Sequence, residues 1–204
     1  MNQEFEHFRR PVNLSDYVRV YDNVLDADAC ASLIESFDAD PRTAQRENQY
    51  MYFAENNISR NEWDVADLYE SVLQYRERYL TDLELPAVMM PTEHSYEEMR
   101  MRKFRSGIGD HFFPHVDVVG NKTMSRQLSF IWFLNTATAC EVDFMRLDQP
   151  IKIAAQQGRL LVFPSTWQYL YQITEPTDTD VYMIASHVHY TDLYQNQGEQ
   201  HGDN

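Results

Sequence analysis

The sequence predicts one mainly β domain, a sandwich or barrel, preceded by helices. Beyond Pro91 the chain is a series of short apolar and aromatic runs separated by turns such as DQP and QQG, which is typical of folds built from short strands. The 13 Tyr and 11 Phe residues also favour a sheet. A length of 204 residues suits a single domain. We expect it over residues 1–194, with helical support in 1–95, core strands in 96–190 and a disordered tail in 195–204.

The N-terminal half contains one predicted strand, two predicted helices and a long loop. Residues 17–24 are β-branched and aromatic, as in a strand. Asp26 or Asp28 can cap a helix that ends before Pro41. A second helix is predicted for 61–83, and the polar, aperiodic segment 38–60 reads as loop. The apolar stripes of the two helices comprise Ala31, Leu33, Ile34 and Phe37, and Trp63, Leu68, Val72, Tyr75 and Tyr79.

The C-terminal half is predicted to be strands. In the segment EEMRMRKF, residues 97–104, methionine alternates with arginine, and this period of two places Met99 and Met101 on the core side. The remaining predicted strands cover 126–135, 141–147, 151–155, 159–164 and 181–190.

The charge of the chain limits its partners. Thirty-two acidic and 17 basic residues give a net charge of −15, which repels the phosphate backbone of nucleic acids. No apolar run is long enough to cross a membrane, and the N-terminus has no signal-peptide pattern. We therefore expect a cytoplasmic protein that binds neither nucleic acid nor membrane. Cys30 and Cys140 lack the spacing of a metal or redox motif.

A candidate metal pair lies in the segment FFPHVDVV. His115 and Asp117 are two residues apart on a predicted strand, so their side chains project from one face. An imidazole and a carboxylate, completed by a third ligand, form the facial arrangement of non-heme iron enzymes. Alone, an H-x-D pair is a weak signal, since it occurs by chance in many chains.

The stretch from Met99 to Tyr190 resembles the prolyl 4-hydroxylase-like branch of the 2-oxoglutarate and iron(II) dioxygenases. The resemblance is carried, in the family's order, by MRKFRSGIGDHFFPHVD, RQLSFIWFLN, CEVDF, GRLLVFPSTW and VYMIASHVHY. It implies a double-stranded β-helix, a cupin-like jelly roll, with helices packed outside. It also implies Fe(II) bound by His115, Asp117 and a distal histidine, and 2-oxoglutarate held by a basic residue, often with a tyrosine.

The sequence departs from the family pattern at three positions. Tyr171 stands where the distal histidine belongs, Val181 where the basic anchor belongs, and Phe104 where the loop tyrosine belongs. Valine cannot form the charge-assisted hydrogen bonds that fix a carboxylate. Binding of 2-oxoglutarate is therefore doubtful unless another cation replaces the anchor.

Several residues could replace the missing groups, and the sequence alone does not choose among them. Tyr171 and His187 are the candidates for the third metal ligand, and His111 and His189 are weaker ones. Arg159 and Arg126 are the candidates for cofactor binding, followed by Lys152 and Arg105. The candidates for a substrate pocket are Trp132, Trp167, Phe104 and Val181, although aromatic residues are also ordinary core residues.

Two functional hypotheses follow. The first is an iron-dependent oxidoreductase acting on a small molecule or peptide, with altered metal ligation and weakened or absent use of 2-oxoglutarate. The second is a catalytically inactive relative that serves as a binding module. The sequence names neither a substrate nor an oligomeric state.

Overall fold

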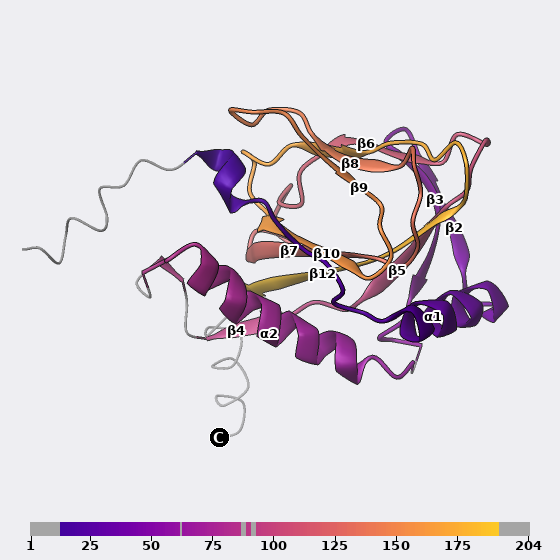
Figure 1. Cartoon of the computed structure of the whole chain (residues 1–204), viewed down its shortest axis with the longest axis horizontal. Helices are drawn as coiled ribbons and strands as arrows, with labels where there is room; N and C mark the ends of the chain where they lie inside the picture. The colour runs from indigo at the N-terminus through magenta and orange to yellow at the C-terminus, as the bar shows by residue number, and fades with distance from the viewer. Residues whose placement is uncertain (1–12, 62, 87–88, 91–92, 192–204) are drawn as a thin grey trace, which may run out of the picture.

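Twelve antiparallel strands form one curled sheet in the computed structural model, which describes residues 13–61, 63–86, 89–90 and 93–191. The strand order is β1-β10-β7-β12-β5-β3-β6-β11-β8-β9, with β2 added to β3 and β4 to β12. Figure 1 shows the curl: β6, β8 and β9 lie across from β7, β10 and β12. The predicted tail, 195–204, lies outside the described residues.

Helices and strands mix in the N-terminal half of the chain, whereas strands follow one another from His94 onward. After a short 3-10 turn at Leu14–Tyr17, the elements are β1 Arg19–Tyr21, α1 Ala27–Ala39, β2 Ala44–Asn48, β3 Met51–Asn57, α2 Ala66–Asp82, β4 His94–Tyr96, β5 Arg100–Phe104, β6 His111–His115, β7 Arg126–Phe133, β8 Glu141–Phe144, β9 Ile151–Ala154, β10 Arg159–Pro164, β11 Tyr171–Ile173 and β12 Val181–Tyr190.

Both helices pack outside the sheet, as predicted. They lie below the layer that holds β7, β10 and β12 (Figure 1). Asp26 caps α1 by accepting a hydrogen bond from the Ala29 amide at 2.7 Å. In α2, Leu68, Val72 and Tyr79 are buried, as the stripe predicted. In α1, Ala31 is exposed and Cys30 is buried instead. The helices therefore cover the outer face of the sheet and leave its inner face for the site.

The sheet separates two hydrophobic cores, because side chains alternate along each strand. On β7, Phe130 and Trp132 join the core beneath the helices, whereas Ile131 and Phe133 join the core inside the curl. Met99 and Met101 also lie in the core beneath the helices. This arrangement confirms the predicted alternation of residues 97–104 and turns the neighbouring arginines toward the inside of the curl.

The prediction of loop for residues 38–60 is wrong. This segment contains the hairpin β2–β3, and β3 pairs with both β5 and β6 inside the sheet. The N-terminal half therefore supplies a central strand as well as helices. β3 looked aperiodic because Glu55 and Asn56, although polar, are buried. Glu55 is neutralised by arginines from other strands, which a local pattern does not show.

Two smaller differences concern the strands near the predicted metal pair. β6 ends at His115, so Asp117 lies just beyond the strand. Tyr171 begins the three-residue strand β11, which was not predicted, and it pairs across the sheet with His115. Within the described ranges, no helix is both long enough and apolar enough to cross a bilayer.

Candidate functional site

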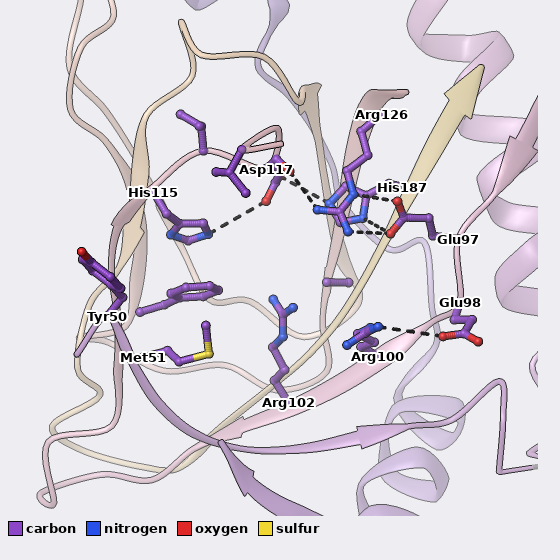
Figure 2. A pocket seen from close by; sticks show the side chains of 14 residues that line it. Tyr50, Met51, Glu97, Glu98, Arg100, Arg102, His115, Asp117, Arg126 and His187 are labelled. Carbon is purple, nitrogen blue, oxygen red and sulfur yellow. Dashed lines mark hydrogen bonds and ion pairs between the residues drawn. The ribbon is translucent and has the colours of Figure 1, made fainter. Parts of the chain in front are cut away.

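A cavity of about 460 Å³ opens beside His115 and Asp117. Figure 2 shows both side chains facing His187 and Arg126 across it. The structure thus brings four of the predicted site residues together. The full lining consists of Tyr50, Met51, Glu97, Glu98, Arg100, Arg102, Phe112, His115, Val116, Asp117, Val119, Arg126, Ala185 and His187.

His115, which lines this cavity, directs an unprotonated nitrogen at Asp117. Its Nδ1 lies 2.8 Å from the carbonyl oxygen of Phe113, which can only accept, so Nδ1 carries the proton. Burial lowers the pKa of the His115 ring and so favours its neutral form, although the charge of Asp117 acts in the opposite direction. Nε2 is buried and has no hydrogen-bond partner among the described residues. It lies 3.9 Å from Oδ1 of Asp117.

Asp117 is a buried carboxylate held from two sides. Its Oδ2 accepts a short hydrogen bond from the Ser129 hydroxyl, and its Oδ1 accepts one from the Tyr171 hydroxyl at 3.1 Å. Burial alone would raise the pKa of Asp117, but the hydrogen bond and charge of His187 keep it well below its ordinary value. The group is therefore an oriented anion.

His187 lies on the other side of that anion. Its Nε2 is 3.5 Å from Oδ2 of Asp117, and its Nδ1 is 3.2 Å from Oε2 of Glu97. Glu97 in turn accepts two hydrogen bonds from Arg126, each 2.7 Å long. A carboxylate on one ring nitrogen is the usual means of orienting a metal-binding histidine. This contact leaves Nε2 of His187 directed at Asp117.

Tyr171 acts as a hydrogen-bond donor in this structure. Its ring is 4.3 Å from that of His115, measured between centroids, and its side chain is buried. Burial and the charge of Asp117 raise the pKa of Tyr171 well above its ordinary value of 10.0. A protonated phenol is a poor metal ligand compared with an imidazole. His187 is therefore the better placed of the two candidates for a third ligand.

The three ligand candidates do not form a closed coordination shell. Within the described part of the chain, no group of three His, Cys, Asp or Glu side chains has the arrangement of a preformed metal site. Donor atoms that share one ion at about 2.0–2.3 Å lie about 3 Å apart. A bound ion would therefore require the distances of 3.9 Å and 3.5 Å to Asp117 to shorten. The unpartnered Nε2 of His115 and the oriented carboxylate of Asp117 are nevertheless donors of the kind that a divalent iron or zinc ion binds.

The other predicted site residues lie away from this cavity. Val181 and Phe104 are paired across β12 and β5 and are fully buried in the core inside the curl. Trp132 packs beneath the helices because its side chain points to the outer face of β7. Trp167 is 75% exposed and borders a separate depression with Leu14. None of these four side chains lines the cavity.

The remaining polar candidates are also held elsewhere. Arg159 donates to Asp22 at 2.7 Å and is not part of the cavity lining. Lys152 pairs with Glu141 at 3.3 Å. Arg105 is held by the buried Asp110 at 2.9 Å. His111 contacts the Gly109 carbonyl, and His189 borders a neighbouring surface depression.

Sequence reasoning missed four charged residues of the cavity: Glu97, Glu98, Arg100 and Arg102. A signal for the two arginines was present in the alternation of residues 97–104. Once Met99 and Met101 face the helices, the intervening arginines must point to the inner face of the sheet. An arginine on the inner face of a curled sheet is costly without partners, and this cost marks it as a candidate for function.

Acidification is expected to destabilise the protein through Glu97. Burial opposes its charge, but the hydrogen bonds from His187 and Arg126 lower its pKa from 4.5 to about 2. The contribution of the ionised Glu97 to the free energy of unfolding is fully present above pH 4.5 and is lost as the pH falls toward 2. Urea unfolding at pH 6 and pH 3 should show a loss of about 2 kcal/mol from this group.

The Glu97→Gln variant should lack that part of the pH dependence. Glu98→Gln is the matched control. Glu98 pairs with the exposed Arg60, and such a pair contributes less to the free energy of unfolding than a buried one. Equal pH dependence in Glu97→Gln and the unmodified protein would contradict the assignment.

No protein-family model and no curated protein sequence matches this chain. Solved structures do match. A viral collagen prolyl hydroxylase from Paramecium bursaria Chlorella virus-1 aligns with a TM-score of 0.66 at 11% identity, over 86% of this chain and 97% of that one. A Pseudomonas putida prolyl-4-hydroxylase aligns with a TM-score of 0.66 at 14% identity, over 87% and 97%.

A Trichoplax adhaerens prolyl hydroxylase, solved with a hypoxia inducible factor peptide, aligns with a TM-score of 0.67 at 11% identity, over 91% of this chain and 89% of that one. At such identities the likeness concerns the fold. The chain therefore has the double-stranded β-helix fold of the 2-oxoglutarate and iron(II) oxygenases. More narrowly, it is similar to the prolyl 4-hydroxylases, as the motifs predicted.

Proposed function

We propose that this protein binds iron(II) through His115, Asp117 and His187 and acts as an oxidoreductase on a small molecule or peptide. The observation that carries the proposal is the buried, unpartnered Nε2 of His115, which lies beside the oriented carboxylate of Asp117. His187 supports it, because Glu97 occupies its other ring nitrogen. Two imidazoles and one carboxylate are the donor set of the non-heme iron oxygenases.

Each neighbour of this donor set has a role that its contacts define. Bound iron(II) supplies one-electron redox chemistry and open coordination positions. Ser129 and Tyr171 hold the Asp117 carboxylate in place. Arg126 fixes Glu97, and it also donates to the backbone carbonyl of Asp117 at 2.9 Å. These contacts favour one orientation of the ligands and reduce the cost of ordering them on binding.

The interior of the curl does not fit 2-oxoglutarate in the manner that the family resemblance implies. The two positions expected to hold its far carboxylate are Val181 and Phe104, both fully buried among apolar side chains. An unpaired carboxylate there would lose its hydration without gaining a partner. We therefore propose that 2-oxoglutarate, if it is used, is not anchored at these positions.

Metal titration of the histidine variants tests the proposed function. Purified protein is titrated anaerobically with iron(II) in a calorimeter. His187→Gln should weaken binding by at least about 10-fold, because a ligand is removed. His189→Gln is the matched control, since His189 lies two residues along the same strand, outside the cavity lining. Equal binding by both variants would remove His187 from the ligand set, and no binding by the unmodified protein would refute the proposal.

A non-catalytic binding module is the second candidate function. One observation favours it: both oxygens of Asp117 already accept hydrogen bonds from protein hydroxyl groups. Such a carboxylate is stable without a metal. Absence of iron binding together with retained binding of an organic ligand in the cavity would support this second candidate.

A further inference from the structure

We propose that Arg102 anchors the carboxylate of a small organic anion in the cavity beside His115 and Asp117. The inference extends the proposed function by assigning a ligand class to the same site, and it rests on that proposal for the role of the ligand in a reaction. Arg102 lies on β5, and Figure 2 shows its guanidinium group pointing into the space that His115 and Asp117 face.

Arg102 is held on one side and free on the other. Its Nε donates to Oε2 of Glu55 at 3.2 Å, and its guanidinium carbon lies over the rings of Phe53 and Phe112 at 5.3 Å and 5.6 Å. Within the described ranges, its two terminal nitrogens have no hydrogen-bond partner in the protein. The group is only 15% exposed, so its orientation is set by packing before any ligand binds.

The surroundings of Glu55 carry more positive than negative charge. This single buried carboxylate is shared by Arg46, Arg100 and Arg102, at 3.1 Å, 3.5 Å and 3.2 Å. Arg46 is outside the cavity lining, whereas Arg100 and Arg102 are part of it. Arg100 also pairs with Glu98 at 3.9 Å, but Glu98 is shared with Arg60. Two carboxylates cannot neutralise these four guanidinium groups, so this part of the cavity attracts an anion although the whole chain is acidic.

The other walls indicate which anion fits. Met51, Phe112 and Ala185 provide an apolar surface for a hydrocarbon body, whereas Glu97 and Asp117 repel a second concentrated negative charge. The planar fork of a guanidinium group matches a carboxylate in a bidentate contact. A carboxylate attached to an apolar body therefore fits this cavity better than inorganic phosphate does. The carboxylate can belong to an oxo-acid co-substrate or to the substrate itself, and this chemistry is shared by both sources.

Calorimetry on the full-length, metal-free protein tests the inference with four probes. These are 4-phenylbutyrate, the uncharged 4-phenylbutan-1-ol, 2-oxoglutarate and inorganic phosphate. We expect at least one carboxylate to bind, and Arg102→Met to weaken its binding by about 10- to 100-fold, the equivalent of a charge-assisted hydrogen bond. Preference for 2-oxoglutarate would assign the site to a co-substrate, and preference for 4-phenylbutyrate to a substrate. Binding of phosphate alone, or of no probe, would overturn the inference.

Arg46→Met is the matched control. It removes a guanidinium group from the same Glu55 but leaves the cavity lining intact. Its carboxylate affinity should stay within about twofold of the unmodified protein, because the ligand contact remains. An equal loss in Arg46→Met and Arg102→Met would show a general charge effect and reject the anchor. Should Arg102→Met fold poorly, Arg102→Lys keeps the charge but loses the planar fork, and it should retain only part of the affinity.

Iron(II) titration of the same variants separates this inference from the proposed function. Arg102→Met should bind iron(II) as the unmodified protein does, because Arg102 contacts none of the three ligand candidates. Metal binding without carboxylate binding would reject the anchor alone. Carboxylate binding without metal binding would reject the proposed function and leave the anchor standing.

Discussion

Replacing Val181 by lysine is expected to destabilise the protein by about 3–5 kcal/mol, because it buries an ammonium group without a partner. Val181 is fully buried, lies opposite Phe104 in the sheet, and belongs to the core inside the curl with Phe163 and Met183. In the prolyl 4-hydroxylase-like family that the sequence resembles, this position carries the basic residue that anchors 2-oxoglutarate, so the substitution restores a basic residue there. Its surroundings in this chain are apolar, and denaturant unfolding should report a loss of stability.

Val119→Lys is the control for this prediction. Val119 is 76% exposed, so the same change there should alter the free energy of unfolding by no more than about 0.5 kcal/mol. The double variant Tyr171→His and Val181→Lys should likewise fail to gain 2-oxoglutarate turnover. A stable Val181→Lys protein that binds 2-oxoglutarate more tightly would show that the interior of the curl accommodates the anchor after all.

Replacing Asp117 by asparagine is expected to lower iron(II) affinity by at least about 100-fold, since a buried site loses its anionic ligand. The side chain keeps its shape. The oxygen of the new amide can still accept one of the two hydrogen bonds from the hydroxyl groups of Ser129 and Tyr171, and the other hydroxyl group can turn to accept from the new NH2 group. The fold should therefore persist. Anaerobic calorimetry with iron(II) measures the affinity, and thermal unfolding checks the fold.

Asp110→Asn is the matched control for the loss of a buried acidic group. Asp110 is fully buried and paired with Arg105, but it does not line the cavity. The substitution should reduce stability by breaking that pair and leave iron(II) affinity unchanged. Similar affinities for iron(II) in the two asparagine variants would remove Asp117 from the proposed ligand set.

Most strands and both helices were predictable because their signals are local. Leu68, Val72 and Tyr79 recur at the period of a helix, and Met99 and Met101 at the period of a strand, so burial follows directly from spacing. β3 was missed because its buried Glu55 is neutralised by Arg46, from the neighbouring strand of its hairpin, and by Arg102, from a strand far along the chain. A hydrophobicity pattern records the polarity of a residue and carries no information on a distant partner.

The sequence by itself predicted a mainly β sandwich or barrel, and the resemblance of its motifs to the 2-oxoglutarate oxygenases implied a double-stranded β-helix. It also singled out His115 and Asp117, which lie two residues apart. It left Tyr171 and His187 as equal alternatives. Only the tertiary structure shows that Glu97 orients His187 while Tyr171 donates to Asp117, and this difference is why we propose His187 as the third ligand.

The tertiary structure also decided where the cationic groups of the cavity lie. Arg159, and position 181 where the family resemblance implies a basic residue, lie away from the cavity, whereas Arg102 lies inside it. The physical reason is that alternation along a strand is a local property, whereas the pairing of segments far apart in the chain places β12, β5, β3 and β6 side by side in one curled sheet. Which side chains then share one enclosed space depends on register and curvature, and neither is encoded within a single strand.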